Sequence, residues 1–200
     1  MLFGLYEQEI LNSLKNIPEH YKFFIDLGAA DGYYGIGVLI NNQFEHSYCF
    51  EISKSGQKAL LNNAAMNSVS DRVTIHGIAE KDFLKHIPED RLPRSVLLVD
   101  IEGGEFDLFN PNLFEKLKRS IVFIEIHDWL IDDGERKLKK LKVEADPYFH
   151  ITELTMTSRD LSGFSELKKF NDTDRWIICS EGRKQLMTWL RLDPRLNLSS

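Results

Sequence analysis

The segment from Phe23 to Gly37, which reads FFIDLGAADGYYGIG, constrains the fold more than any other part of the chain. It begins with an apolar run that is typical of a buried parallel strand, and it then breaks on a series of glycines. A strand that ends on glycine and leads into a helix brings bare backbone and a helix N-terminus to the carboxyl edge of a sheet, where cofactors bind. The segment therefore predicts an α/β fold with a ligand site at that edge.

The spacing of these glycines indicates the kind of ligand. A dinucleotide fingerprint has the form G-x-G-x-x-G, which lets the backbone contact a pyrophosphate. Here Ala30 stands in the place of the second glycine, and the next glycine is Gly32. Asp26 and the D-x-G-x-x-x-G spacing favour a cofactor with an amino-acid end and no phosphate. A nicotinamide-dependent oxidoreductase stays open as an alternative, with the Ala30 mismatch against it.

Apolar runs alternate with helical patterns along the chain, which is typical of repeated β-α units and a mostly parallel sheet. Strands are predicted at 23–27, 47–51, 73–76, 95–101, 120–126, 151–156 and 176–179. Helices are predicted at 5–16, 34–41, 53–66, 80–86, 105–118 with a break at Asn110-Pro111, 132–145 and 183–192. The polar end, 196–200, is expected to fray.

The composition is that of one globular domain. Its 200 residues divide into an N-terminal helix over 1–20, an α/β core over 21–182, and a C-terminal helix and tail over 183–200. The net charge of −6 argues against a nucleic-acid partner, which usually leaves a basic stripe. Cys49 and Cys179 form no metal or disulfide pattern, and no apolar stretch is long enough to span a membrane. We expect a cytoplasmic protein that binds a small molecule; a homo-oligomer stays open.

Glu51 ends the second predicted strand, 23 residues after Gly28. This is close to the position at which nucleotide-binding α/β proteins place an acid against ribose hydroxyls. A solvent-facing acid at a strand end is the other interpretation, but the glycine loop upstream favours a ribose contact. After the third predicted strand, Ala79 and Glu80 are expected to lie beside the base that the ribose of such a ligand carries, an adenine in this interpretation.

Acidic residues follow the fourth predicted strand, in the segment DIEGGEFD at 100–107. An unpaired buried carboxylate is costly, so Asp100 should lie at the open edge of the sheet or have a partner. On the fifth strand, alternation points Glu125 and His127 the same way. With Asp100 they can form a general-base pair or an oxygen-rich metal site. An internal pair that only fixes the strand is the structural alternative.

Four segments together resemble the class I S-adenosylmethionine-dependent methyltransferases, and specifically the FkbM family. The segments, within residues 23–128, are IDLGAADGYYG, the acid of YCFE, VDIEGGEFDLF and IEIH. The resemblance implies a Rossmann-like domain with a seven-stranded sheet of order 3-2-1-4-5-7-6, strand 7 antiparallel, and helices on both faces. It also implies S-adenosylmethionine as the cofactor and methyl transfer to oxygen, which we expect on a small hydroxylated acceptor such as a sugar.

The resemblance also suggests a role for each candidate residue. Residues expected to bind the cofactor are Asp26, Gly28, Ala30, Gly32, Tyr33, Glu51, Ile52, Ala79, Glu80 and Asp100. Glu102 and Glu105 are expected to bind the substrate. We expect His127 to act as the general base, oriented by Glu125, with Asp100 beside the reacting centre. A divalent ion on Asp100, Glu125 and His127 is an alternative that we do not expect, and a non-catalytic cofactor-binding partner subunit is another.

Overall fold

The computed structural model describes residues 5–183 and 185–195. Its strands are β1 (Phe23–Leu27), β2 (His46–Phe50), β3 (Val73–His76), β4 (Ser95–Val99), β5 (Ile121–Ile126), β6 (Phe149–Thr155) and β7 (Thr188–Pro194). Its helices are α1 (Gln8–Lys15), α2 (Tyr33–Ile40), α3 (Lys54–Met66), α4 (Glu105–Leu108), α5 (Pro111–Leu117), α6 (Gly134–Ala145) and α7 (Asp172–Cys179). The predicted helix at 80–86 is a short 3-10 turn over Phe83–His86.

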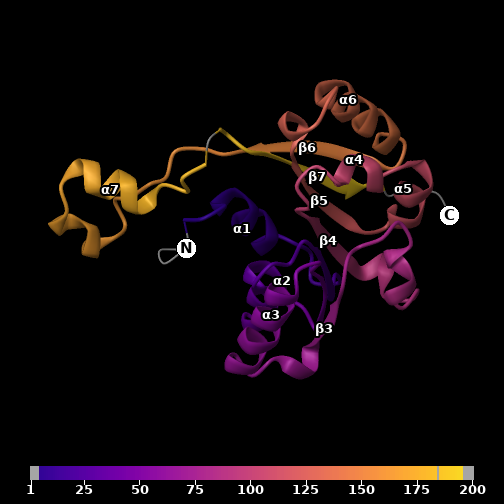
Figure 1. Ribbon diagram of the computed structural model, residues 1–200, viewed down its shortest axis with the longest axis horizontal. Coiled ribbons are helices and arrows are strands. Elements are labelled where there is room, and N and C mark those ends of the chain that lie inside the picture. Colours follow the sequence, from indigo (N-terminus) through magenta and orange to yellow (C-terminus); the bar gives the residue numbers. More distant parts are fainter. Residues whose placement is uncertain (1–4, 184, 196–200) are drawn as a thin grey trace.

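The strands form one sheet of order β3-β2-β1-β4-β5-β7-β6 (Figure 1). β1 pairs in parallel with β2 and β4, and β7 runs antiparallel to both β5 and β6. The predicted order and the antiparallel seventh strand are therefore confirmed. Because β1, β2, β4 and β5 all run the same way, the loops after them meet at one carboxyl edge.

Helices cover both faces of the sheet and divide the core in two. On one face, α1, α2 and α3 pack over buried sheet residues such as Phe24 and Val96. On the other face, α5 and α6 pack over sheet residues such as Ile25 and Leu97. β1 is buried along its whole length because it is covered on both sides, which explains why its residues other than Asp26 are apolar.

Local signals explain several helix ends. The side chain of Ser53 accepts a hydrogen bond from the Gly56 amide, so α3 begins directly after Ser53, at the start of the helix predicted over 53–66. The side chain of Asn110 accepts one from the Leu113 amide and thereby starts a new helix, α5. The predicted helix at 105–118 is accordingly divided into α4 and α5.

Two predictions near the C-terminus are wrong. The predicted strand at 176–179 belongs to helix α7, whose start is capped by Asn171 through the Asp174 amide. The second half of the predicted helix at 183–192 is strand β7, which begins at Thr188. Pairing with β5 on one side and β6 on the other satisfies the β7 backbone and buries Leu190 and Leu192, so tertiary pairing outweighs local preference. The expected fraying at 196–200 lies outside the described residues.

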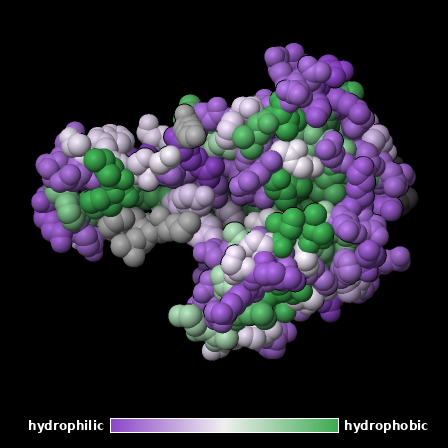
Figure 2. Space-filling model, in the orientation of Figure 1, coloured by the Kyte–Doolittle hydropathy of each residue, from purple (hydrophilic) through white to green (hydrophobic). Residues whose placement is uncertain are grey.

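The connection from β6 to β7, residues 156–187, is called the arm below. It extends away from the sheet with α7 near its far end, and its apolar atoms stand out on the projection (Figures 1 and 2). The arm has a small core of its own, to which Leu161, Leu167 and Cys179 contribute together with Leu5. It leaves and rejoins the sheet at the carboxyl edge, because Thr188 pairs with both Ile126 and Thr155.

Candidate active site

The glycine loop after β1 is held tightly against the loop after β4. Gly28 has a φ of +88°, and a Cβ atom there would lie 1.8 Å from the Asp100 carbonyl oxygen. Only glycine fits this position, because both the backbone conformation and the space exclude a side chain. Ala30 also has a positive φ, of 47°. The loop thus exposes its backbone at the sheet edge, as the sequence predicted.

Asp26 lies beneath this loop and not in the open site. It is buried, and its Oδ2 accepts a hydrogen bond of 2.9 Å from the Gly35 amide in α2. Burial raises the pKa of this carboxyl from its ordinary value to about 7. Gly32 caps α2, and the Tyr33 hydroxyl donates to the Tyr6 carbonyl oxygen at 3.3 Å. These three predicted cofactor residues therefore shape the loop and its surroundings, and none of them lines the cavity beside it.

A cavity of about 700 Å³ opens at the carboxyl edge, beside the glycine loop. The predicted residues that line it are Gly28, Ala30, Glu51, Ile52, Ala79, Glu80, Asp100 and Glu102. The sequence analysis did not select Ile78, Lys81 or Asp107, which line it as well. Ile52 and Ile78 are largely exposed, so the cavity has an apolar rim that a flat aromatic ring can cover.

Glu51 is fixed in this cavity by the backbone around it. Its Oε2 accepts a hydrogen bond of 2.9 Å from the Ala30 amide, and its Oε1 accepts one of 2.7 Å from the Ser53 amide. The residue is 8% exposed. An ionised carboxylate has about four acceptor sites, so Glu51 keeps capacity for two hydroxyl donors from the cavity.

Carboxylates dominate the charge of the cavity lining. The acidic residues that line it are Glu51, Glu80, Asp100, Glu102 and Asp107. Lys81 is the basic residue in the described lining. A ligand with positive charge is electrostatically favoured in such a cavity, whereas a pyrophosphate is disfavoured.

Beyond Asp100, His127 lies in a group of carboxylates and is itself almost fully buried. The His127 amide donates a hydrogen bond of 2.9 Å to Glu105 Oε1, and the His127 ring Nδ1 lies 3.5 Å from the same oxygen. Glu105 Oε2 accepts from the Gly103 amide at 2.8 Å. Both oxygens of this fully buried carboxylate are thus committed, so Glu105 positions His127 and is not placed to bind a substrate.

The other ring nitrogen of His127, Nε2, faces two carboxylates. Glu125 Oε2 lies 3.6 Å away and Asp100 Oδ1 lies 3.8 Å away, both beyond hydrogen-bonding distance. Burial acts to lower the pKa of His127, but Glu105 and Asp100 outweigh it and the net shift is upward. Burial, reinforced by Asp100, raises the pKa of Glu125 to about 9. We expected Glu125 to orient the imidazole, but Glu105 and Glu125 lie almost equally near its two ring nitrogens, at 3.5 Å and 3.6 Å, and it is the backbone amide of His127 that is hydrogen-bonded to Glu105.

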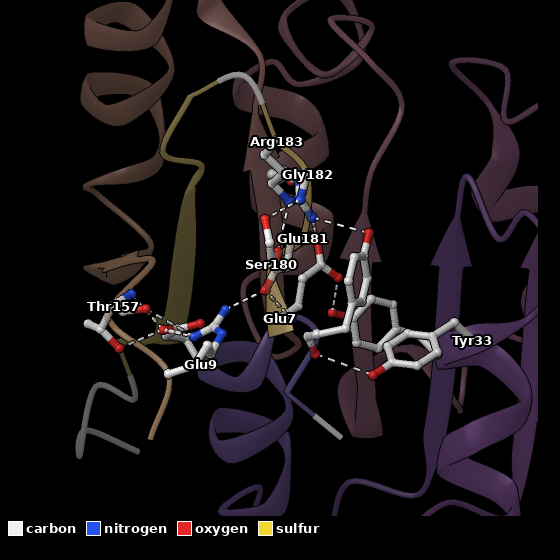
Figure 3. A network of polar contacts seen from close by, with 12 residues as sticks. Glu7, Glu9, Tyr33, Thr157, Ser180, Glu181, Gly182 and Arg183 are labelled. Atoms are coloured by element: carbon white, nitrogen blue, oxygen red, sulfur yellow. Dashed lines mark hydrogen bonds and ion pairs between the residues drawn. The ribbon is translucent and has the colours of Figure 1, made fainter. Parts of the chain in front are cut away.

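Three residues at this site had no signal in the sequence. Arg183 of the arm donates to Glu125 Oε1 at 2.7 Å, to Glu7, and to the Tyr6 hydroxyl at 3.2 Å (Figure 3). Glu7 is buried and also accepts from the Tyr34 hydroxyl. These residues lie far from the motifs along the chain, and only the fold brings them to the end of β5.

Solved structures of other proteins match nearly the whole chain. Sp1610 of Streptococcus pneumoniae has a TM-score of 0.58 and 13% identity, over 96% of this chain and 72% of its own. TrmK of M. capricolum, solved with S-adenosylhomocysteine, has a TM-score of 0.56 and 13% identity, over 93% and 68%. TYW2 of M. jannaschii, solved with AdoMet, has a TM-score of 0.54 and 13% identity, over 96% and 76%.

No protein-family model and no curated protein matches the chain, so the FkbM family is not shown. TrmK of B. subtilis is described as an M1A22 tRNA methyltransferase, which contrasts with our expectation of no nucleic-acid partner. That substrate is a property of the B. subtilis protein, because likeness at such low identity shows the fold alone. Among the described residues, no helix has the length and apolar character needed to cross a bilayer. The chain has the Rossmann-like fold of the S-adenosylmethionine-dependent methyltransferases.

Proposed function

We propose that the protein is an S-adenosylmethionine-dependent methyltransferase (EC 2.1.1.-) whose cofactor binds in the cavity at the carboxyl edge. The observation that carries this proposal is the geometry of Glu51, which two backbone amides hold at the cavity while its remaining acceptor sites stay free. A ribose offers two neighbouring hydroxyl donors that suit this carboxylate. Gly28 and Ala30 leave open backbone beside it for the amino-acid end of the cofactor.

The charge of the cavity supports this cofactor over a nicotinamide dinucleotide. S-adenosylmethionine carries a sulfonium and an ammonium group, and it supplies an electrophilic methyl group when bound. The acidic lining, with Lys81 as its basic member, favours that charge and opposes a pyrophosphate. The Ala30 mismatch with the dinucleotide fingerprint agrees with this preference.

On the acceptor side, we infer that His127 takes a proton from a hydroxyl group. Its Nε2 atom lies beyond hydrogen-bonding distance of the two facing carboxylates, and Glu105 fixes the residue from the opposite side through the His127 backbone amide. Asp100 links the two parts of the site, because it lines the cavity and lies beside His127. The protein then contributes alignment of the acceptor and removal of its proton.

The charges near His127 favour a small neutral acceptor over a phosphate-rich one. Asp100, Glu125 and Glu105 surround the imidazole, and the guanidinium of Arg183 is already bound by carboxylates. A nucleic-acid backbone gains nothing from such a surface. A hydroxylated small molecule, such as the sugar suggested by the FkbM-like motifs, is the acceptor that we propose.

A divalent ion does not fit the candidate ligand set as it stands. Asp100, Glu125 and His127 do present ligand atoms within 4.8 Å of one another. However, Arg183 binds Glu125 Oε1 at 2.7 Å, so a fixed cation already occupies one side of that carboxylate. Two cations at one buried carboxylate repel each other, and no step of the proposed reaction uses a metal.

Two measurements test the proposed function. Titration calorimetry with S-adenosylhomocysteine, S-adenosylmethionine and NAD⁺ should give heat for the first two ligands and none for NAD⁺. Labelled methyl transfer should then be followed with a panel of sugars and phenols and with total tRNA, and label is expected on a small hydroxylated compound. Label on tRNA would contradict the acceptor class. Cofactor binding without transfer to any acceptor would favour the non-catalytic partner subunit, and absence of heat with both sulfur ligands would end the proposal.

A further inference from the structure

Arg183 connects the arm to the group of residues around His127. Its guanidinium donates to Glu125 Oε1 at 2.7 Å and to Glu181 Oε2 at 2.9 Å. It also donates to Glu7 and to the Tyr6 hydroxyl, and it lies 5.4 Å from the centre of the Tyr6 ring (Figure 3). The side chain is 19% exposed. A guanidinium bound on several sides in this way is held in one orientation.

The contact with Glu125 matters because Glu125 has a second potential partner. Glu125 is buried, and its Oε2 lies 3.6 Å from His127 Nε2. A modest rotation of the carboxylate would bring the two into a hydrogen bond. A buried carboxyl group that lost its partner would gain from that rotation, because an unpaired buried polar group is costly. Arg183 holds the other oxygen and so opposes the rotation.

We propose that Arg183 is a positioning residue that holds Glu125 back from His127 Nε2 and leaves this nitrogen free to take the proton of the acceptor. The inference rests on the proposed function. Because Arg183 lies where the arm returns to the sheet, the arm would then help to position the residues that remove the acceptor proton. The Glu105 carboxylate lies on the Nδ1 side of the ring and binds the His127 amide, and Arg183 acts on the Nε2 side through Glu125.

The arm also supplies a matched control, Arg159. Among the described residues, its hydrogen bonds go to Glu9 at 2.6 Å, to Glu181, and to the Thr157 carbonyl oxygen. Arg159 therefore attaches the arm to the N-terminal segment much as Arg183 does, but none of its hydrogen bonds named above goes to Glu125. Loss of Arg159 should loosen the arm and leave the surroundings of His127 as they are.

The test compares Arg183→Met, Arg183→Lys and Arg159→Met with the unmodified protein. Crystal structures with S-adenosylhomocysteine should show Glu125 within hydrogen-bonding distance of His127 Nε2 in Arg183→Met alone. Methyl transfer to the best acceptor of the panel should fall about 100-fold in Arg183→Met, at the lower end of what a general base contributes. Arg183→Lys keeps a cation for Glu125, so it should recover most of the loss, and Arg159→Met should stay within about threefold of the unmodified protein. The affinity for S-adenosylhomocysteine, measured by calorimetry, should be unchanged in all three variants.

The outcomes separate this inference from the proposed function. Failure of the unmodified protein to bind S-adenosylhomocysteine would count against the proposed function, and crystals without ligand would still show whether Glu125 turns. Glu125 unmoved in Arg183→Met would overturn the inference. Equal losses of methyl transfer in Arg183→Met and Arg159→Met would also overturn it, because the two arginines would then serve only to attach the arm.

Discussion

The two halves of the carboxyl edge are built in different ways. The cofactor half, around β1, β2 and β4, relies on backbone: Gly28 meets a carbonyl oxygen across the loop, and Glu51 is held by amide groups. The acceptor half, at the end of β5, relies on side chains from distant segments, with Arg183 bound to Glu125 and Glu7.

This difference explains why the sequence indicated Glu125 and His127 in the acceptor half but not their partners Arg183 and Glu7. A backbone that must turn sharply needs glycine at fixed spacing, so the pattern of residues records the shape of the loop. A charged side chain needs only a partner of opposite charge, and the partner can come from anywhere in the chain. If the two halves are built in these different ways, a substitution in one half should leave the other half intact.

Replacing Gly28 by alanine tests the backbone-built half most severely. Gly28 has a φ of +88°, and an added Cβ atom would lie 1.8 Å from the Asp100 carbonyl oxygen, so there is no room for a methyl group. We expect Gly28→Ala to lower the free energy of unfolding by about 4 kcal/mol and to abolish heat with S-adenosylhomocysteine. Gly37→Ala is the control, because that Cβ would meet nothing within 4 Å, and it should stabilise α2 by about 0.5–1 kcal/mol. Similar urea midpoints for Gly28→Ala and Gly37→Ala would contradict the view that the backbone at Gly28 excludes a side chain.

Asp26 gives the same half a measurable dependence on pH. Its pKa is about 7 in the folded protein against an ordinary value of 3.8, so the folded protein keeps a proton that the unfolded chain releases. The free energy of unfolding should therefore fall as the pH rises from about 4 to about 7. Asp26→Asn removes this contribution, which is about 2–4 kcal/mol. Urea unfolding at pH 4, 6 and 8 should show the variant gaining stability relative to the unmodified protein as pH rises, and a constant difference would contradict the assignment.

His127 tests the acceptor half. His127→Ala should reduce methyl transfer about 100-fold or more, because a general base contributes at least that much. The unmodified enzyme should gain activity as the pH rises through the elevated pKa of His127, since only the neutral imidazole accepts a proton. Affinity for S-adenosylhomocysteine should stay the same. His150→Ala, at an exposed site, should behave like the unmodified protein. Unchanged turnover in His127→Ala would remove this residue from the mechanism.

Replacing Glu51 by glutamine should affect binding and leave the acceptor half intact. A glutamine side chain has one oxygen for the two amides of Ala30 and Ser53, and it lacks the charge that attracts ribose hydroxyls. We expect the dissociation constant for S-adenosylhomocysteine to rise about 10- to 100-fold. Glu135→Gln, at an exposed site on α6, is the control. An unaltered affinity in Glu51→Gln would show that the cofactor does not lie against this residue.

Removal of metal should have the smallest effect of all. Arg183 already binds the Glu125 carboxylate, so thorough dialysis against EDTA should leave methyl transfer within experimental error of the untreated protein. Loss of activity that Mg²⁺ or Mn²⁺ restores would favour the metal-assisted alternative on Asp100, Glu125 and His127.

The fold was predictable from the sequence up to the end of β6. The apolar runs, the predicted helix start at Ser53 and the predicted break at Asn110-Pro111 gave the positions of the strands and helices, because these signals are local. The segment after residue 156 was not predictable. The run at 176–179 suits either a strand or an exposed helix, and β7 forms because two neighbouring strands receive it.

The location of the candidate site was predictable from the sequence, but the roles of several of its side chains were not. The sequence indicated most of the cavity lining, because Glu51 and the glycine loop follow strands at fixed distances. It assigned Asp26 to the cofactor, whereas the side chain supports the loop from below. It assigned Glu105 to the substrate, although both oxygens bind backbone amides. Sequence patterns place a residue near a site, but they do not show where its side chain points.

A crystal structure with bound S-adenosylhomocysteine tests the central claim most directly. The account predicts the ribose hydroxyls on the Glu51 carboxylate, the amino-acid end against the backbone of Gly28 and Ala30, and the sulfur atom on the side of Asp100 that leads to His127. A ligand bound elsewhere on the protein, or a ribose turned away from Glu51, would contradict it.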